Sequence, residues 1–254
     1  MRVAFVGKGG SGKSAIAGTF ARSLAKRGEP VLTIDSDPMP GLAFSLGLDR
    51  DDTPLPEDIV VARQEGEDGP RWRLRSDLTP LDVIEKYALT GPDGVRFFQF
   101  GKLRGHSSTI MKSQFAFMQI IAKLPEDLPW SVVGDLPGGT RQPFAGWGDY
   151  ADMFIAIIEP MAKSMLAGRR LANLAARPDG PKSIVAIANK VREEGDRALV
   201  QERTGLRVIG AVPFDTAFAD AERQARAPID AVPDSPAVLA VESLVDQLIE
   251  ERQL

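Results

Sequence analysis

A glycine-rich run near the start of the chain lies between an apolar segment and a segment with helical spacing. Residues 7–14 read G-K-G-G-S-G-K-S and fit the pattern G-x-x-x-x-G-K-[ST]. Residues 3–6 before the run are apolar and predict a buried strand. Residues 15–26 after it carry apolar side chains at helical spacing. The beginning of the fold is therefore restricted to a strand, a tight loop and a helix.

The chemistry of this run, here called the phosphate loop, predicts an anion site. Glycines have no side chain in the way, so successive backbone N–H groups can surround phosphate oxygens. The following helix adds its unpaired N–H groups and the positive end of its dipole. Lys13 is expected to reach the β- and γ-phosphates of a nucleoside triphosphate, and the Ser14 hydroxyl to bind Mg²⁺. The expected phosphate-binding residues are Gly7, Lys8, Gly9, Gly10, Ser11, Gly12, Lys13, Ser14 and Ala15.

The composition is that of an ordinary globular protein, with 26% charged and 43% hydrophobic residues in 254. A net charge of −4 argues against sequence-independent binding of nucleic acid, which depends on many Lys and Arg contacts to phosphate. No apolar run approaches the roughly 20 residues that cross a bilayer. The chain also enters its first predicted strand at once, without a signal peptide. We expect a cytoplasmic protein that binds neither nucleic acid nor membrane.

Cysteine is absent, and His106 is the one histidine. Disulfides, iron–sulfur clusters and cysteine-bound zinc or nickel are thereby excluded. A site with several histidines from one chain is excluded as well. Two copies of His106 in a symmetric dimer could still face each other across the axis.

Apolar segments alternate with helical patterns almost to the end of the chain. The predicted strands are residues 3–6, 31–34, 95–100, 131–133, 153–158, 184–188 and 208–212. The predicted helices are residues 15–26, 80–88, 110–123, 162–176, 196–204, 217–226 and 237–250. This order predicts an α/β fold, with a mostly parallel, twisted sheet of seven to eight strands and helices on both faces. We expect a single domain, residues 1–254, with an irregular insertion at 49–75 that forms a hairpin around Val60 and Trp72.

Acidic residues follow two of the predicted strands. Asp35 and Asp37 come after residues 31–34, and Asp135 comes after residues 131–133. In open α/β sheets, residues at the carboxyl ends of strands point into the crevice where ligands bind. We therefore expect all three carboxylates beside the phosphate loop, where they would hold Mg²⁺ mainly through water.

The segment after Asp135 predicts a sensor of the nucleotide. Its sequence is Leu-Pro-Gly-Gly, and a glycine N–H there can approach the γ-phosphate and respond to its presence. Gly138 and Gly139 are both candidates for this contact. The aromatic residues that follow belong either to the core or to a docking surface for a partner protein; they are Phe144, Trp147 and Tyr150.

Lys8, directly after the first glycine, narrows the pattern to G-K-G-G-x-G-K-S. With it the sequence resembles the deviant Walker A ATPases, which include MinD, ParA, the nitrogenase iron protein, the arsenical-pump ATPase and the CooC-type nickel-insertion ATPases. The resemblance implies a dimer in which Lys8 reaches the phosphates of the facing subunit. A positive charge supplied there would stabilise the transition state as an arginine finger does. The alternative is a solvated loop lysine.

The resemblance also implies further roles. Asp37, before a proline on the first nucleotide-sensing loop, would orient the attacking water or accept its proton. Asn189, with Lys190, would contact the adenine edge, although each of these elements could be only a strand-ending turn. A GTP-binding N-K-x-D signature would need an aspartate where the chain has Arg192, so we expect ATP. The residues implied to border the purine are Pro213, Phe214 and Asp215.

Within this group the sequence is most similar to the CooC-type maturation ATPases of carbon monoxide dehydrogenase. The similarity covers most of the chain. It is carried by the phosphate loop and by residues 35–38, 91–105, 212–215, 227–229 and 235–237. That family holds nickel with a C-x-C pair from each subunit, and the matching stretch, residues 106–111, has no cysteine. Thiolates suit nickel better than a hydroxyl or a thioether does, so metal insertion is in doubt. His106 and Met111 are either a different soft-metal site across the dimer or interface and surface residues.

We therefore expect a Mg²⁺-dependent, dimeric switch ATPase that converts ATP to ADP and phosphate. Its expected role is that of a CooC-like accessory or maturation factor for a metalloenzyme or another client protein. The alternative is a positioning or partition ATPase of the MinD or ParA type. Against that alternative, the amphipathic end of the chain, residues 241–252, is acidic and should be repelled by anionic lipid.

Overall fold

The computed structural model describes residues 1–37, 41–49, 55–69, 71–99, 107–177, 181 and 183–253. An eight-stranded sheet runs through the described part in the order β10-β9-β8-β1-β7-β2-β6-β5. Neighbouring strands are parallel, except that β5 is antiparallel to β6. The predicted α/β class and mostly parallel sheet are confirmed. The strands are β1 (Arg2–Gly7), β2 (Val31–Asp35), β5 (Leu89–Thr90), β6 (Arg96–Gln99), β7 (Ser131–Asp135), β8 (Met153–Ile158), β9 (Ser183–Val191) and β10 (Val208–Pro213).

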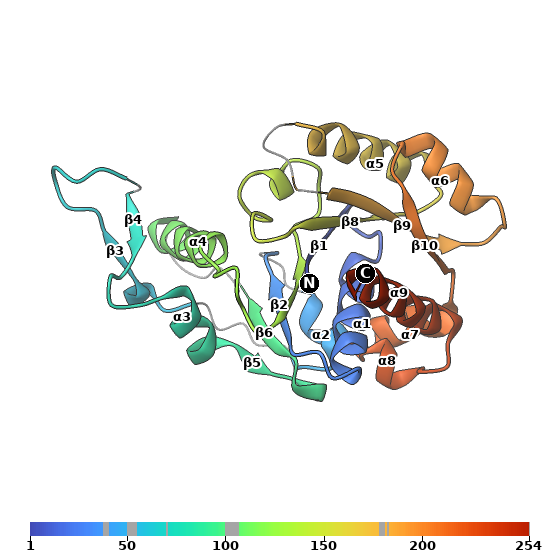
Figure 1. Ribbon diagram of the computed structural model, residues 1–254, viewed down its shortest axis with the longest axis horizontal. Coiled ribbons are helices and arrows are strands. Elements are labelled where there is room, and N and C mark those ends of the chain that lie inside the picture. Colours follow the sequence, from blue (N-terminus) through green and yellow to red (C-terminus); the bar gives the residue numbers. More distant parts are fainter. Residues whose placement is uncertain are drawn as a thin grey trace.

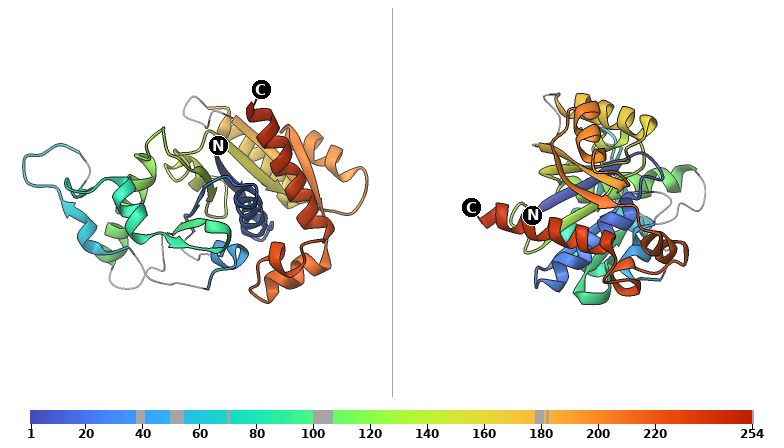
Figure 2. Two further views of the ribbon diagram at one scale, coloured as in Figure 1. Left: turned by 60° about the horizontal axis from the view of Figure 1, so that its bottom comes forward. Right: turned by 90° about the vertical axis from the view of Figure 1, so that its right-hand side faces the viewer.

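Helices cover both faces of this sheet (Figures 1 and 2). One face carries α1 (Lys13–Lys26), α2 (Leu42–Leu46), α7 (Thr216–Arg223), α8 (Pro228–Ala231) and α9 (Pro236–Gln253). The other carries α3 (Pro80–Tyr87), α4 (Ser107–Ala122), α5 (Ala162–Ala175) and α6 (Asp196–Thr204). Short 3-10 turns lie at η1 (Glu57–Ile59), η2 (Pro92–Gly94) and η3 (Gln142–Phe144).

A separate hydrophobic core lies on each face of the sheet, and the side chains of β1 point alternately into one core and the other. Val3 and Phe5 pack in the core beneath α1 and α9, whereas Ala4 and Val6 pack in the core beneath α4 and α5. The Phe5 ring meets the ring of Phe20 from α1 edge to face, with centroids 5.4 Å apart. Burial on both faces explains why the predicted strands read as apolar runs without polar alternation.

Some strands and helices end at other residues than predicted, and polar side chains or left-handed backbone conformations lie at these ends. Strand β9 continues to Val191 because Asn189 still pairs with Val212 of β10, although its amide side chain ends the apolar signal. Helix α7 ends at Arg223, before the predicted end at residue 226, and Ala225 has a left-handed φ of 54°. Helices α2 and α8 were not predicted because one turn of helix shows no periodicity. Phe100, at the end of a predicted strand, lies outside the described residues.

A small antiparallel hairpin projects from the sheet at the left of Figure 1. It consists of β3 (Val60–Ala62) and β4 (Trp72–Leu74), with Ala62 opposite Trp72. Gln119 of α4 holds it, because its amide accepts from Leu74 N at 2.9 Å and donates to the Trp72 carbonyl. We retain as a proposal that residues 49–75 are an insertion into one domain.

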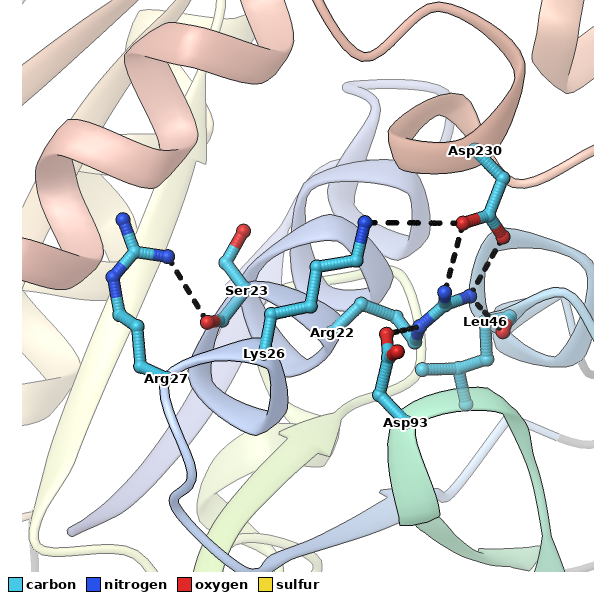
Figure 3. A network of polar contacts seen from close by, with 7 residues as sticks. All are labelled: Arg22, Ser23, Lys26, Arg27, Leu46, Asp93 and Asp230. Carbon is cyan, nitrogen blue, oxygen red and sulfur yellow. Dashed lines mark hydrogen bonds and ion pairs between the residues drawn. The ribbon is translucent and has the colours of Figure 1, made fainter.

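A buried arginine fixes the helix that follows the phosphate loop (Figure 3). Arg22 of α1 is 2% exposed and pairs with Asp93 at 2.6 Å and, through two nitrogens, with Asp230 at 2.8 Å. It also donates to the Leu46 carbonyl at the end of α2. Burial alone would lower the pKa of this guanidinium, but the hydrogen bonds to both carboxylates raise it. Helix α1 is thus tied to α2, η2 and α8.

Candidate functional site

The phosphate loop connects β1 to α1 through backbone conformations that glycine adopts readily. Gly10 and Gly12 have φ of 81° and 87°. A side chain at Gly7 would approach the Ile157 carbonyl oxygen of β8 to 2.8 Å. Gly12, at the N-cap of α1, has no side chain to bond the first turn, so the N–H groups there stay available to an anion. The loop therefore fits a phosphate group.

Two side chains of the loop converge on one carboxylate. Lys13 Nζ forms an ion pair with Asp135 Oδ1, and the Ser14 hydroxyl donates to Asp135 Oδ2. Lys13 and Asp135 are 7% and 1% exposed, so this contact is shielded from water. The register of β7 with β1 places Asp135 beside Phe5, two residues before the loop begins. A hydroxyl and a carboxylate side by side are the oxygen ligands that Mg²⁺ accepts.

Asp35 and Asp37 lie on the neighbouring strand end, as predicted for a site at the carboxyl edge of the sheet. Asp35 pairs in register with Asp135 and accepts hydrogen bonds from the backbone N–H groups of Asp37 and Leu42 at 3.0 and 3.1 Å. Burial, followed by the negative charge of Asp135, raises the pKa of Asp35 to about 7. Asp37 is half-buried next to it. The structure brings all three predicted carboxylates to one edge of the sheet.

Both candidate sensor glycines contact the phosphate loop. Gly139 has φ of 141°, and its N–H donates to the Gly7 carbonyl at 3.1 Å. A side chain at Gly138 would approach the Cα and N of Gly9 to 3.2 Å. The segment after β7 therefore lies against the phosphate loop, and its role as a sensor of the nucleotide stays a prediction.

Asn189 and Lys190 have a role that the sequence did not reveal. The Asn189 amide donates to the Ser11 carbonyl at 2.7 Å, and Lys190 Nζ donates to the Gly10 carbonyl at 3.1 Å. Lys190 also pairs with Glu159 at 3.4 Å. These contacts brace the loop from β9. The available signal was an Asn-Lys pair at a strand end, but nothing in the sequence shows which segment it faces.

The third implied element lies beside these residues. Pro213 ends β10, and the Phe214 N–H donates to the Val191 carbonyl at 2.9 Å. Asp215 is the N-cap of α7, where its carboxylate accepts from the N–H groups of Ala217 and Phe218. This capping role was not predicted for Asp215.

Lys8 lies at the exposed outer side of the loop. It lines a cavity of about 360 Å³ that also includes Gly139 and the basic residues Lys163 and Arg170 of α5. Lys13, the other loop lysine, instead points into the buried site with Asp135.

Comparison with known proteins identifies the family. A sequence model of the CobQ/CobB/MinD/ParA nucleotide binding domain matches residues 3–229. The chain belongs to this family. Its membership agrees with the predicted resemblance to deviant Walker A proteins.

Relatives and solved structures extend this result. An uncharacterised ATP-binding protein of Methanocaldococcus jannaschii is 28% identical over 257 residues, which cover 98% of each chain. The carbon monoxide dehydrogenase accessory protein CooC of Rhodospirillum rubrum is 27% identical over 234 residues, covering 88% of this chain and 87% of CooC. The fold is shared with the septum site-determining protein MinD of Pyrococcus horikoshii, complexed with Mg-ADP, at a TM-score of 0.72 and 16% identity. That comparison covers 97% of this chain and 94% of MinD.

Three other predictions from the sequence concern the aromatic residues after β7, the residues His106 and Met111, and the absence of membrane-spanning helices. Trp147 and Tyr150 are 7% and 4% exposed and pack in the core, so they form no docking surface. His106 lies outside the described residues, and Met111 lies in α4 at a position whose side chain is not described. In the described part of the chain, no helix is long and apolar enough to cross a membrane.

Proposed function

We propose that the protein is a Mg²⁺-dependent ATPase that works as a dimeric switch. The observation that carries this proposal is the convergence of Lys13 and Ser14 on Asp135 at the base of the phosphate loop. Membership of a nucleotide-binding family and similarity to an ATP-binding relative support the choice of nucleotide.

In this proposal, different residues of the site bind the phosphates, hold the cation and position the attacking water. The backbone N–H groups of the loop and the first turn of α1 bind the β- and γ-phosphate oxygens. Lys13 would exchange its buried contact with Asp135 for the phosphates. Ser14 would then hold the cation directly, and the Asp135 carboxylate would hold it mainly through water. Mg²⁺, when bound, supplies positive charge to the phosphate oxygens. Asp35 and Asp37 hold the surrounding water, and Asp37 orients the water that attacks the γ-phosphate.

Dimerisation completes the site in this proposal. Lys8 of one subunit would reach the phosphates of the other. Its cavity is lined by Lys163 and Arg170, so two copies that meet face to face bring positive charges together. The negative charge of two bound triphosphates would offset this repulsion. This balance supports a dimer that forms with ATP and opens after hydrolysis.

Lys8→Ala tests the dimer. Sedimentation of the full chain with Mg-ATP should show a dimer for the wild type and a monomer for the variant, with hydrolysis reduced at least tenfold. Lys86→Ala, on α3, is the matched control and should behave as the wild type. Intact ATP-driven dimerisation and hydrolysis in Lys8→Ala would exclude the proposed role of Lys8. Lys13→Ala should abolish nucleotide binding itself.

The client is proposed from similarity to CooC, an accessory protein of carbon monoxide dehydrogenase. We propose an accessory or maturation role for a metalloenzyme or another client protein. In this role the chain itself would hold no nickel through cysteine, since it has no cysteine. The test is to mature a metalloenzyme encoded by a neighbouring gene with and without this protein and ATP. A gene neighbourhood of division or partition proteins would instead favour a positioning ATPase of the MinD or ParA type.

A further inference from the structure

Lys190 reaches the phosphate loop from an irregular point in β9. Its backbone is left-handed, with φ of 59°, although it is not a glycine. It is also the extra residue of a bulge, because consecutive residues of β10 pair with Asn189 and Val191 on either side of it. Such a backbone persists only where the surrounding structure imposes it. The bulge directs the Lys190 side chain onto the loop, where Nζ donates to the Gly10 carbonyl at 3.1 Å.

Glu159 contacts the same ammonium group from the end of the adjacent strand. It follows β8, which pairs with β9, and one of its carboxylate oxygens lies 3.4 Å from Lys190 Nζ. The side chains of Glu159 and Lys190 are 19% and 37% exposed, so the ion pair is partly shielded from water. The attraction between the two charges favours the arrangement in which Lys190 lies between Glu159 and the loop.

The backbone of Glu159 is fixed by the first turn of α5. Its N–H donates at 3.0 Å to the Oγ of Ser164, a residue that is 5% exposed. Its carbonyl accepts from the Met161 N–H at 2.7 Å, and the Met161 carbonyl accepts from the Ser164 N–H at 2.9 Å. The Glu159 carboxylate therefore extends from a rigid point, so it can define the position of Lys190.

The carbonyl that Lys190 holds determines where an N–H group of the loop points. In a planar trans peptide, the N–H that follows a carbonyl points the opposite way. Holding the Gly10 carbonyl therefore turns the Ser11 N–H away from β9, and that N–H bonds the Lys8 carbonyl across the loop at 3.2 Å. Asn189 holds the Ser11 carbonyl in the same manner, at 2.7 Å. The loop thus has its shape before a phosphate arrives and loses less conformational freedom on binding.

We infer that Glu159 is a positioning residue of the phosphate loop, which holds Lys190 on the Gly10 carbonyl and so keeps the loop in the shape that binds phosphate. The inference rests on the proposed function, because it requires that the phosphates of a nucleotide occupy the loop. It adds to that function a carboxylate that acts through Lys190. This role differs from the contact with the adenine edge that the family resemblance implies for Lys190.

The negative charge of Glu159 makes the direction of one effect decisive. A carboxylate near an anion site repels the anion, so its removal should strengthen phosphate binding if charge alone mattered. If Glu159 positions Lys190, its removal should instead weaken phosphate binding in spite of the lost repulsion. Glu159→Gln separates the two cases because it removes the charge and keeps the size of the side chain.

Calorimetric titration of the full chain with Mg-ADP, and with inorganic triphosphate and Mg²⁺, measures this direction without hydrolysis. Glu159→Gln should weaken the binding of both ligands by about threefold to fivefold, as expected for the loss of a partly exposed ion pair. The matched control is Glu193→Gln. Glu193 is an exposed carboxylate near Lys190 in the chain that, among the described residues, makes no ion pair with it. This control should bind both ligands at least as tightly as the wild type.

A double variant tests whether Glu159 acts through Lys190. Lys190→Met should weaken both ligands by the same factor, because the contact with the Gly10 carbonyl affects the phosphates and not the base. Glu159→Gln added to Lys190→Met should cause no further loss of affinity, since the residue through which it acts is already gone.

The outcomes separate this inference from the proposed function. Triphosphate binding by Glu159→Gln that is unchanged or tighter would overturn the inference, as would a further loss in the double variant. Lys190→Met that weakens Mg-ADP but not triphosphate would overturn it too, because Lys190 would then act on the base. Nucleotide binding itself would stand in all three cases. A wild type that binds neither ligand would overturn the proposed function as well. Melting temperatures without ligand show that each variant is folded.

Discussion

The ammonium group of Lys13 and the carboxylate of Asp135 form an ion pair at the base of the phosphate loop, where both side chains are buried. Asp135→Ala would leave the ammonium group without its partner in a site shielded from water. We expect this change to lower the free energy of unfolding by about 3–5 kcal/mol. Urea denaturation without nucleotide measures the loss.

The control replaces both charges. Lys13→Met combined with Asp135→Leu removes the whole ion pair and leaves no unpaired ammonium group, so this double variant should be more stable than Asp135→Ala. Equal stability of the wild type and Asp135→Ala would show that Lys13 finds another partner or reaches water.

Gly134 of β7 contacts Tyr150 on the face of the sheet opposite to the Asp135 side chain. A side chain at residue 134 would lie 1.6 Å from the Tyr150 hydroxyl oxygen. Gly134→Ala should therefore overpack the core and lower the free energy of unfolding by about 1–3 kcal/mol. That hydroxyl is buried and, in the described part of the chain, has no hydrogen-bond partner. Tyr150→Phe should consequently raise stability by about 1 kcal/mol.

A double-variant cycle measured by thermal or urea unfolding separates these effects. Gly134→Ala should cost less in the Tyr150→Phe background, because the closest atom is gone. Identical costs in the two backgrounds would mean that the clash is relieved elsewhere.

Asp35 predicts a pH dependence of stability. Its pKa is raised from 3.8 to about 7, so between these values the folded protein holds a proton that the unfolded chain has released. Its contribution to stability is fully present below about pH 4 and is lost as the pH rises through about 7. The asparagine in Asp35→Asn cannot ionise, so the unfolding free energy of this variant should lack this dependence on pH.

The measurement is the difference in unfolding free energy between wild type and Asp35→Asn, in Mg²⁺-free buffer from about pH 4 to about pH 8. The wild type should lose stability relative to the variant across this range. A difference that does not change with pH would show that the pKa of Asp35 in the folded protein is not raised into this range.

Arg22 and Arg27 of α1 allow a comparison of a buried and an exposed ion pair. Arg22→Met removes the donor to Leu46 and the contacts to Asp93 and Asp230, and should cost about 1–3 kcal/mol. Arg27→Met breaks a pair with Asp246, whose side chain is 54% exposed, and should cost less than about 1 kcal/mol. Urea denaturation of both variants at low and high salt checks this order. Equal costs would indicate that the Arg22 network is no stronger than a surface pair.

Much of the fold could be predicted because its signals are local. The phosphate loop has a fixed spacing of glycines, and the central strands are apolar on both faces. Asp35 and Asp135 could be placed together because parallel strands end at a common edge.

The rest depends on contacts between distant residues. Asn189 meets Ser11, and Arg22 meets Asp230, only after the sheet is assembled. The close packing of Tyr150 over Gly134 could not be predicted either, because the sequence shows only that Gly134 belongs to a strand. Such pairings leave no periodic pattern along the chain, so they could not be predicted from the sequence.

The bracing of the phosphate loop by β9 has a consequence for biosynthesis. The loop is synthesised well before Asn189 and Lys190, the residues whose side chains hold its carbonyl groups. Strand β1 itself lies between β7 and β8, which are also translated much later. Domains of this size form through such non-local contacts slowly. A nascent chain would therefore carry the whole glycine motif without a complete nucleotide site until β9 has been synthesised, and ATP could stabilise the fold only after that point.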